Sequence, residues 1–409
     1  MKRPEILSPA GNFEKMRAAI RYGADAVYLS GKIFGMRAAA DNFSPDELKT
    51  AVEYAHERGV RVYLTVNTMP REYEYSMLED YLVSLGSIPI DALIVADIGV
   101  MALARELLPS VELHVSTQAN SVSSRAVIAW HKLGAKRVVL ARELTLEEIK
   151  AIRAAVPEEI ELECFIHGSM CISYSGRCLL SGHIVSRDAN RGACAQPCRW
   201  NYTLRGYEIT EEKRPDAPMP VEEIGGETFI MSSRDTCTIE HIPELVEAGI
   251  SSFKIEGRMK SAYYTAVVTN TYKMALDAYF SGNYKYDPAW YRELESVSHR
   301  DYATGYYFSD SHVDANTAPT TGYIKDKAYL AVVLSYNEET GTAELSQRNK
   351  MTFGEEIELL TPGRVGQPLT VGELSDENGD PISATCHPYM RFYMKTSVPM
   401  REGDIIRER

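Results

Sequence analysis

Cysteine is the residue type that stands out in this chain, because five of its seven thiols lie in the segment from Cys164 to Cys198. A sixth, Cys237, follows, and the seventh, Cys386, stands far from the others. Grouped thiols are seldom all packing residues, so metal, cluster or redox chemistry is the first interpretation. Cys164 lies in a predicted strand, and we expect both Cys164 and Cys386 to be packing residues.

Five thiols then remain for a four-ligand site: Cys171, Cys178, Cys194, Cys198 and Cys237. A structural zinc site usually shows Cys-x-x-Cys pairs, which this chain lacks. Iron–sulfur clusters take four thiolates at more varied spacing. The three-cysteine pattern of radical S-adenosylmethionine enzymes is absent. A cysteine nucleophile paired with His167 or His183 would instead indicate a protease, but that interpretation leaves the other thiols without a role.

The composition of the whole chain narrows the classes of protein. Its 409 residues fit two domains, or one barrel-sized domain with an appendage. No apolar run approaches the length of a membrane span, and no signal segment follows the first residues. We therefore expect a cytoplasmic protein with reduced thiols and no membrane partner. The net charge of −13 disfavours a broad nonspecific nucleic-acid surface.

The cysteine-rich segment nevertheless forms a basic island in this acidic chain. Between His167 and Arg205 a single acid, Asp188, faces five cations: Arg177, Arg187, Arg191, Arg199 and Arg205. These arginines are either ordinary solvated loop residues or a local surface for an anionic partner.

Short apolar strands alternate with amphipathic helices over the first 165 residues. Strands are predicted at 5–7, 26–29, 61–67, 92–96, 112–115, 137–140 and 161–166, and after the cysteines at 229–232 and 252–256. This alternation predicts a parallel sheet with helical crossovers, most simply a (β/α) TIM-like barrel over residues 1–283. A doubly wound open sheet is the competing architecture, but no glycine-rich dinucleotide fingerprint follows the first strand.

Nine predicted strands for eight barrel positions imply that one belongs to an insertion. Either Phe229–Ser232 or Tyr202–Leu204 is expected in an inserted hairpin, and the cysteine-rich insertion itself spans about 167–205. Residues 284–321 are rich in aromatics and look irregular. From residue 322 to 409, short strands and turns predict a small all-β barrel domain.

Active sites of (β/α) barrels form where the strands end, so polar residues at those ends are site candidates. Candidate substrate-binding residues are Asn67, Gln118, Arg142 and Arg258, together with Arg187, Arg191 and Arg199 of the basic island. Candidate catalytic residues are Lys254, Glu256, Arg258 and His167. Lys254 and Glu256 alternate along one strand, which also suits a mutual ion pair, whereas Arg258 would be an exposed loop charge.

One motif resembles a known family signature. Glu163-x-Phe165-x-x-Gly168-Ser169-Met170-Cys171, followed by Gly176-x-Cys178-x-Leu180-Ser181, is similar to the signature of the collagenase-like peptidase family U32. Leu7–Gly11, Phe253–Arg258 and the C-terminal β domain also look like this family, so the resemblance covers nearly the whole chain.

What the resemblance implies differs from the family's name. The length and domain order are similar to the branch of tRNA hydroxylases that form 5-hydroxyuridine at the wobble position. That resemblance implies an enzyme with a 4Fe–4S cluster, prephenate as co-substrate and a tRNA anticodon stem-loop as partner. The cluster ligands it implies are Cys171, Cys178, Cys194 and Cys237, with Cys198 as the alternative. A peptidase, or a non-catalytic iron–sulfur scaffold or electron carrier, are the other functions considered.

Overall fold

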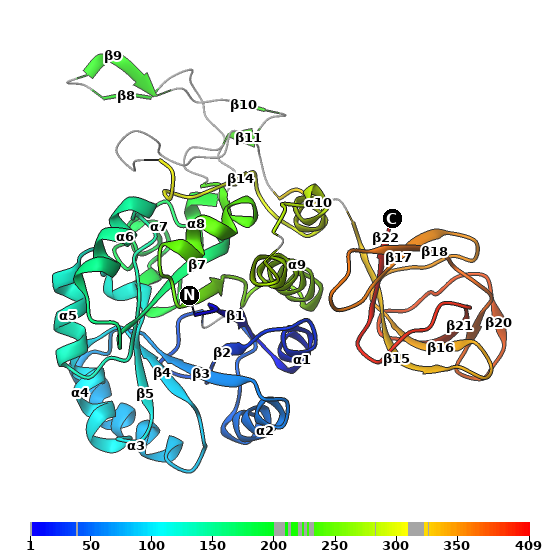
Figure 1. Ribbon diagram of the computed structural model, residues 1–409, viewed down its shortest axis with the longest axis horizontal. Helices are drawn as coiled ribbons and strands as arrows, with labels where there is room; N and C mark the ends of the chain where they lie inside the picture. The colour runs from blue at the N-terminus through cyan, green and yellow to red at the C-terminus, as the bar shows by residue number, and fades with distance from the viewer. Residues whose placement is uncertain are drawn as a thin grey trace.

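The computed structural model describes residues 2–37, 40–199, 233–282, 284–309, 323–325 and 327–409, except the side chain of His183. It also describes the backbone of short strands at 209–211, 214–219, 223–224 and 227–228. Figure 1 shows a barrel ringed by helices, with a separate all-β unit beside α9 and α1.

The barrel is a closed ring of eight parallel strands. They are β1 (Glu5–Pro9), β2 (Ala26–Ser30), β3 (Arg61–Val66), β4 (Ala92–Val95), β5 (Glu112–Val115), β6 (Arg137–Val139), β7 (Glu161–Ser169) and β13 (Ser252–Ile255). Strand β13 pairs with β1 on one side and with β7 on the other, which closes the ring. The predicted TIM-like barrel is therefore confirmed, and the open doubly wound sheet is excluded.

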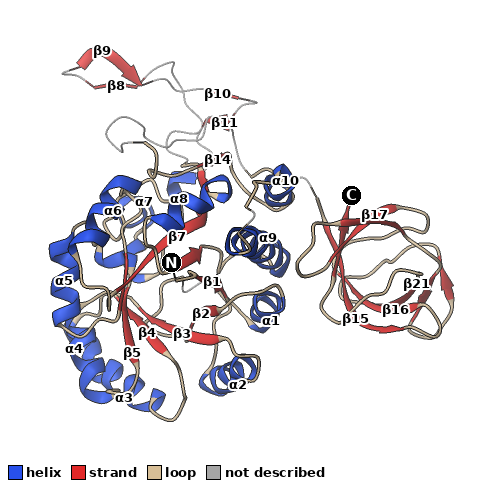
Figure 2. Cartoon of the chain, in the orientation of Figure 1, coloured by secondary structure: helices blue, strands red, loops and turns tan. Residues whose placement is uncertain are grey.

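Helices cover the outside of the ring, as Figure 2 shows. They are α1 (Phe13–Arg21), α2 (Pro45–His56), α3 (Tyr75–Leu85), α4 (Ile98–Leu107), α5 (Ser124–Lys132), α6 (Leu146–Ala155), α8 (Ile242–Glu247) and α9 (Ala262–Phe280). Local sequence sets where several begin: Ser44 with Glu47, and Thr145 with Glu148, form capping boxes that satisfy the first free amides. None of the described helices is long and apolar enough to cross a membrane.

The segment after β7 carries the insertion. It contains α7 (Leu180–Val185) and the antiparallel pairs β8 (Ile209–Glu211) with β9 (Arg214–Met219) and β10 (Glu223–Ile224) with β11 (Glu227–Thr228). The predicted strands Tyr202–Leu204 and Phe229–Ser232 lie outside the described residues. The chain returns through β12 (Asp235–Cys237), which runs antiparallel to the end of β7, and β14 (Tyr302–Ala303) pairs with β12.

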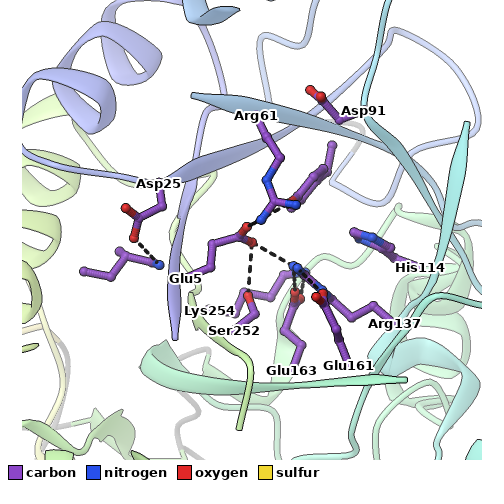
Figure 3. A network of polar contacts seen from close by, with 12 residues as sticks. Glu5, Asp25, Arg61, Asp91, His114, Arg137, Glu161, Glu163, Ser252 and Lys254 are labelled. Atoms are coloured by element: carbon purple, nitrogen blue, oxygen red, sulfur yellow. Dashed lines mark hydrogen bonds and ion pairs between the residues drawn. The ribbon is translucent and has the colours of Figure 1, made fainter. Parts of the chain in front are cut away.

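The barrel interior holds a buried network of charges, drawn in Figure 3. Arg137 is 1% exposed and pairs with Glu5 at 2.7 Å, Glu161 at 2.6 Å and Glu163 at 3.0 Å. Lys254 pairs with Glu163 at 2.6 Å from the neighbouring strand. Burial would raise the pKa of Glu163, but Lys254 and Arg137 outweigh it and lower that pKa to about 2. The network therefore remains charged at neutral pH.

The all-β unit is one antiparallel sheet that curls into a half-barrel. Its strands are β15 (Tyr329–Asn337), β16 (Thr342–Gln347), β17 (Glu356–Leu360), β18 (Gln367–Thr370), β19 (Leu374–Asp376), β20 (Pro381–Ile382), β21 (Arg391–Lys395) and β22 (Ile405–Glu408). The sheet runs in the order β18-β17-β22-β15-β16-β21-β19-β20. Cys386, expected in the packing, is exposed.

Two findings concern the join between the domains. The aromatic segment 284–321 was expected to be irregular, but Pro288–Glu295 form helix α10, with Asp287 as its N-cap. Arg407 of β22 is buried and pairs with Glu293 of α10 at 2.7 Å, while the Tyr22 hydroxyl donates to the carbonyl of Leu360 at 2.8 Å. These buried polar contacts fix the half-barrel against α10 and the end of α1.

Candidate active site at the barrel mouth

Four cysteines line one cavity of about 100 Å³ at the carboxyl ends of the strands. They are Cys171, Cys178, Cys194 and Cys198, and each is partly exposed. The backbone N–H of Gln196 donates to Sγ of Cys194 at 3.3 Å. We call this cavity the cysteine pocket.

Local sequence holds the cysteine-bearing loop in place. Gly168 has a φ of +109°, and a Cβ there would lie 2.3 Å from the carbonyl oxygen of Glu256. Gly176 has a φ of +73°, and a Cβ there would lie 2.2 Å from the carbonyl oxygen of Gln118. Only glycine permits these close approaches. The amide of Ser175 donates to Glu143 at 2.8 Å, which anchors the loop to the end of β6.

The chemistry of this donor set fits a four-thiolate cluster. Among the described residues, no three Cys, His, Asp or Glu side chains are grouped to hold a single metal ion, as a zinc site requires. A 4Fe–4S cluster instead distributes four thiolates around a larger body. The cysteine pocket offers four thiols, and no described histidine lines it.

Cys237, one of the four ligands expected, does not line this pocket. Its strand β12 turns the thiol into the barrel core, where it is 6% exposed and 4.0 Å from the Tyr272 hydroxyl. Burial raises the pKa of the Cys237 thiol to about 12. Cys198, the alternative ligand, lies in the pocket instead. Cys164 is buried within β7, as expected of a packing residue.

A second cavity, of about 50 Å³, opens beside the first. This mouth pocket is lined by residues of seven barrel strands and the loops that follow them, among them Asn67, Gln118, Arg142, Lys254, Glu256 and Arg258. Met36, Arg37, Gln118 and Arg142 line both pockets. The structure thus brings most of the predicted substrate-binding residues together, next to the thiols.

Lys254 and Glu256 do not form the mutual ion pair that their alternation along one strand suggested. Lys254 is held by Glu163, and its Nζ lies 4.7 Å from the centre of the Tyr28 ring. Glu256 faces Arg37 at 3.5 Å. Burial would raise the pKa of Glu256, but Arg37, Arg258 and Arg142 lower it. Glu256 is therefore a carboxylate among three arginines at neutral pH.

Arg258 is not the exposed charge that its loop position suggested. It is 3% exposed, and its guanidinium donates to the carbonyl oxygen of Met36 and to the Thr65 hydroxyl at 3.4 Å. Burial lowers the pKa of Arg258 to about 10, which leaves it cationic at neutral pH. Arg142 is half-buried, donates to the carbonyl of Ser169 at 3.1 Å, and has an Nε with no partner among the described residues. Arg142 is thus the better-placed donor for an anionic ligand.

Asn67 is a structural residue of the mouth. Its Oδ1 accepts from the amide of Met36 at 3.0 Å, and its Nδ2 donates to the Ser116 hydroxyl at 3.2 Å. It therefore holds the loop after β2 over the pocket.

The arginines of the basic island have separate environments. Arg191 pairs with Glu74, and Arg199 lines the cysteine pocket while donating to Gln196 at 2.9 Å and to the carbonyl of Met170 at 3.2 Å. Arg187 is exposed and donates to the carbonyl of Ala193 at 2.9 Å. Arg205 lies outside the described residues. Of the three predicted RNA contacts, Arg187 alone has an exposed side chain.

His167 lines neither pocket. Its ring is 1% exposed, and its nitrogens lie 3.4 Å from the hydroxyls of Tyr272 and Tyr302. Burial lowers the pKa of His167 to about 3, so the ring is neutral. His167 is therefore a buried, neutral ring between two tyrosine hydroxyls.

Arg37 is the mouth residue that the sequence interpretation missed. It follows β2 in a loop where Phe34, Arg37 and Asn42 have positive φ values, and it reaches Glu256 across the mouth. Active sites of (β/α) barrels form at the carboxyl ends of the strands, and Arg37 follows the end of β2. The same rule therefore predicts Arg37 once the residues after β2 are considered.

The fold and the site together define the class of this protein: it is a (β/α) barrel enzyme with a thiol-lined pocket beside a cationic pocket. Comparison with known proteins agrees: peptidase family U32 matches residues 11–317, and the U32 C-terminal domain matches residues 325–407. The chain belongs to peptidase family U32.

Relatives within this family include proteins of RNA modification. Over its full length the chain is 39% identical to tRNA hydroxylation protein P1 of Bacillus subtilis, covering 95% of that protein. It is 35% identical to tRNA hydroxylation protein P of Escherichia coli, with 88% of this chain and 87% of that protein covered. It is also 37% identical to 23S rRNA 5-hydroxycytidine C2501 synthase of Escherichia coli, over 68% of this chain and 40% of that protein.

Proposed function

We propose that this protein is a cytoplasmic tRNA hydroxylase that forms 5-hydroxyuridine at the wobble position, with an iron–sulfur cluster and with prephenate as co-substrate. Relatives named for tRNA hydroxylation and for 5-hydroxycytidine synthesis support hydroxylation of a pyrimidine ring. The observation that carries the proposal is the adjacency of the two pockets, which share Arg37, Gln118 and Arg142.

The two pockets have complementary tasks in this proposal. Cys171, Cys178, Cys194 and Cys198 would hold the cluster, which when bound supplies one-electron transfer. Arg142, with its free Nε, and Arg37 would bind a carboxylate of a small dicarboxylate such as prephenate. Gln118 offers an amide at the boundary of the pockets, where it can orient a ligand by hydrogen bonds.

A direct test is to express the chain in cells that lack their own enzyme for this modification. Nucleosides from the purified tRNA are then analysed by mass spectrometry. We expect a uridine derivative one oxygen atom heavier at the wobble position, and its loss in cells that cannot make prephenate. Unmodified tRNA in the presence of fully iron-loaded protein would refute the proposed reaction and favour a scaffold role.

The peptidase alternative has less support from the geometry. Of the two histidines considered as a base, His167 does not line the cysteine pocket, and the side chain of His183 lies outside the described part of the chain. Cys237 lies opposite His167 on the paired strands β12 and β7, and no hydrogen bond joins the two side chains among the described contacts. Burial raises the pKa of the Cys237 thiol, which keeps it a neutral thiol.

Arg142 provides a test of the anion-binding role. Arg142→Gln removes the charge and the fork of donors, so we expect hydroxylation to fall at least about tenfold, as for other lost charged contacts. Iron content should be unchanged. Prephenate should raise the Tm of the wild type but not of this variant. Arg125→Gln, at an exposed site on α5, serves as the control; equal Tm shifts in both variants would contradict a role for Arg142.

A further inference from the structure

A large groove of about 960 Å³ separates the barrel from the half-barrel, on a side of the molecule that the proposed reaction does not use. Its walls are α1, the end of α2, strand β15 and residues 401–405. Barrel helices run antiparallel to their strands, so α1 begins at the mouth and ends at the opposite side of the barrel. The groove therefore leads from the mouth along the outside of the barrel.

The groove is basic, whereas the chain as a whole has a net charge of −13. Its charged lining consists of five arginines and two glutamates: Arg17, Arg21, Arg58, Arg348, Arg401, Glu14 and Glu402. A local excess of cations along one groove creates a region of positive electrostatic potential, although the molecule as a whole is negatively charged. This charge complements a polyanion.

Several of these guanidinium groups remain available to a ligand. Arg21 and Arg348 are held by Asp404 and Glu14. Arg17 and Arg401 are exposed, and neither makes an ion pair with a described residue. Arg58 donates to the carbonyl of Tyr54 at 3.0 Å, and its ion pair among the described residues is with the exposed Glu57 at 3.3 Å, a kind of pair that contributes little.

Aromatic rings accompany the arginines. The Arg58 guanidinium lies 3.6 Å from the centre of the Tyr54 ring, with Arg17 at 5.3 Å from the same ring. At the rim, Arg348 lies 4.7 Å from the Tyr389 ring, which is 69% exposed and has a φ of +63°. Interleaved arginines and rings suit a nucleic acid, because the cations meet phosphates and the rings and guanidinium planes meet bases or sugars.

We propose that this interdomain groove binds the sugar–phosphate backbone of the substrate RNA at a distance from the nucleotide that is modified. The inference rests on the proposed function. A target base at the barrel mouth leaves the rest of a tRNA to extend along the outside of the protein, where the groove lies. The proposal also explains why buried ion pairs fix the half-barrel to the barrel, because a rigid join holds the two walls of the groove in fixed positions.

The test reverses three exposed charges of the groove in the full-length protein: Arg17→Glu, Arg58→Glu and Arg401→Glu together. The matched control reverses Arg125, Lys132 and Lys150 on α5 and α6, with the same change in net charge. Binding of full-length tRNA is measured by fluorescence anisotropy over a series of salt concentrations. We expect the groove variant to bind roughly tenfold to a hundredfold more weakly and its salt slope to fall by about 2–3, because each lost phosphate contact removes about 0.9 from the slope.

The remaining outcomes separate this inference from the proposed function. The groove variant should still hydroxylate a short anticodon stem-loop at the wild-type rate, since that RNA does not reach the groove. If the wild type and the groove variant bind tRNA equally, RNA binding by the groove is refuted. An equal loss of binding in the control variant would refute it as well. Neither result contradicts the proposed hydroxylase function. Wild-type protein that neither binds nor modifies tRNA would overturn the proposed function itself.

Discussion

Replacing Cys198 with serine is expected to remove the iron–sulfur cluster, whereas replacing Cys237 with serine is expected to leave it in place. Cys198 lines the same pocket as Cys171, Cys178 and Cys194, while the Cys237 thiol lies in the barrel core. A hydroxyl is a poor substitute for a thiolate ligand of iron. Anaerobically purified Cys198→Ser protein should fall from about four irons per chain, the content of one 4Fe–4S cluster, to almost none.

The measurement is iron and sulfide content together with the visible absorption spectrum. Cys171→Ser, Cys178→Ser and Cys194→Ser should give the same loss as Cys198→Ser. Cys386→Ser is the control, because that thiol is exposed on the half-barrel. If Cys237→Ser loses its iron and Cys198→Ser retains it, then β12 must rearrange to present Cys237 when the cluster binds, and the ligand set proposed above is wrong.

The largest effect on stability is expected from Arg137→Met. This change removes the cation that faces Glu5, Glu161 and Glu163 inside the barrel and leaves three carboxylates sharing fewer cations. Breaking a buried ion pair from one side costs about 3–5 kcal/mol. We expect a lower midpoint of thermal unfolding by calorimetry. Arg409→Met breaks an exposed pair with Glu356 and should cost less than about 1 kcal/mol.

The difference between wild type and Arg137→Met should depend on pH. The pKa of Glu163 in the folded protein is about 2, below its ordinary value of 4.5. A carboxyl with a lowered pKa contributes stability that is present above pH 4.5 and is lost as the pH falls toward 2. The gap between the two midpoints should therefore shrink below about pH 4.5. A gap that stays constant down to pH 3 would show that lost packing, and not charge, explains the effect.

Much of the architecture was predictable because it depends on local patterns. Alternating strands and helices, with capping boxes such as Ser44–Glu47, indicate a parallel barrel without any knowledge of distant contacts. Helix α10 was missed because its aromatic residues suggested an irregular segment, whereas Asp287 and Pro288 are a helix start.

By itself, the sequence determined the family signature, the order of the two domains and which residues stand at most strand ends. Only the tertiary structure decided which of those residues share a pocket. Closure of the ring pairs β13 with both β1 and β7, which places Lys254 against Glu163 instead of Glu256. The antiparallel return of β12 turns Cys237 into the core and leaves Cys198 with the other thiols. Spacing along the chain sets local periodicity, but which side chains meet depends on strand pairing between segments far apart in sequence.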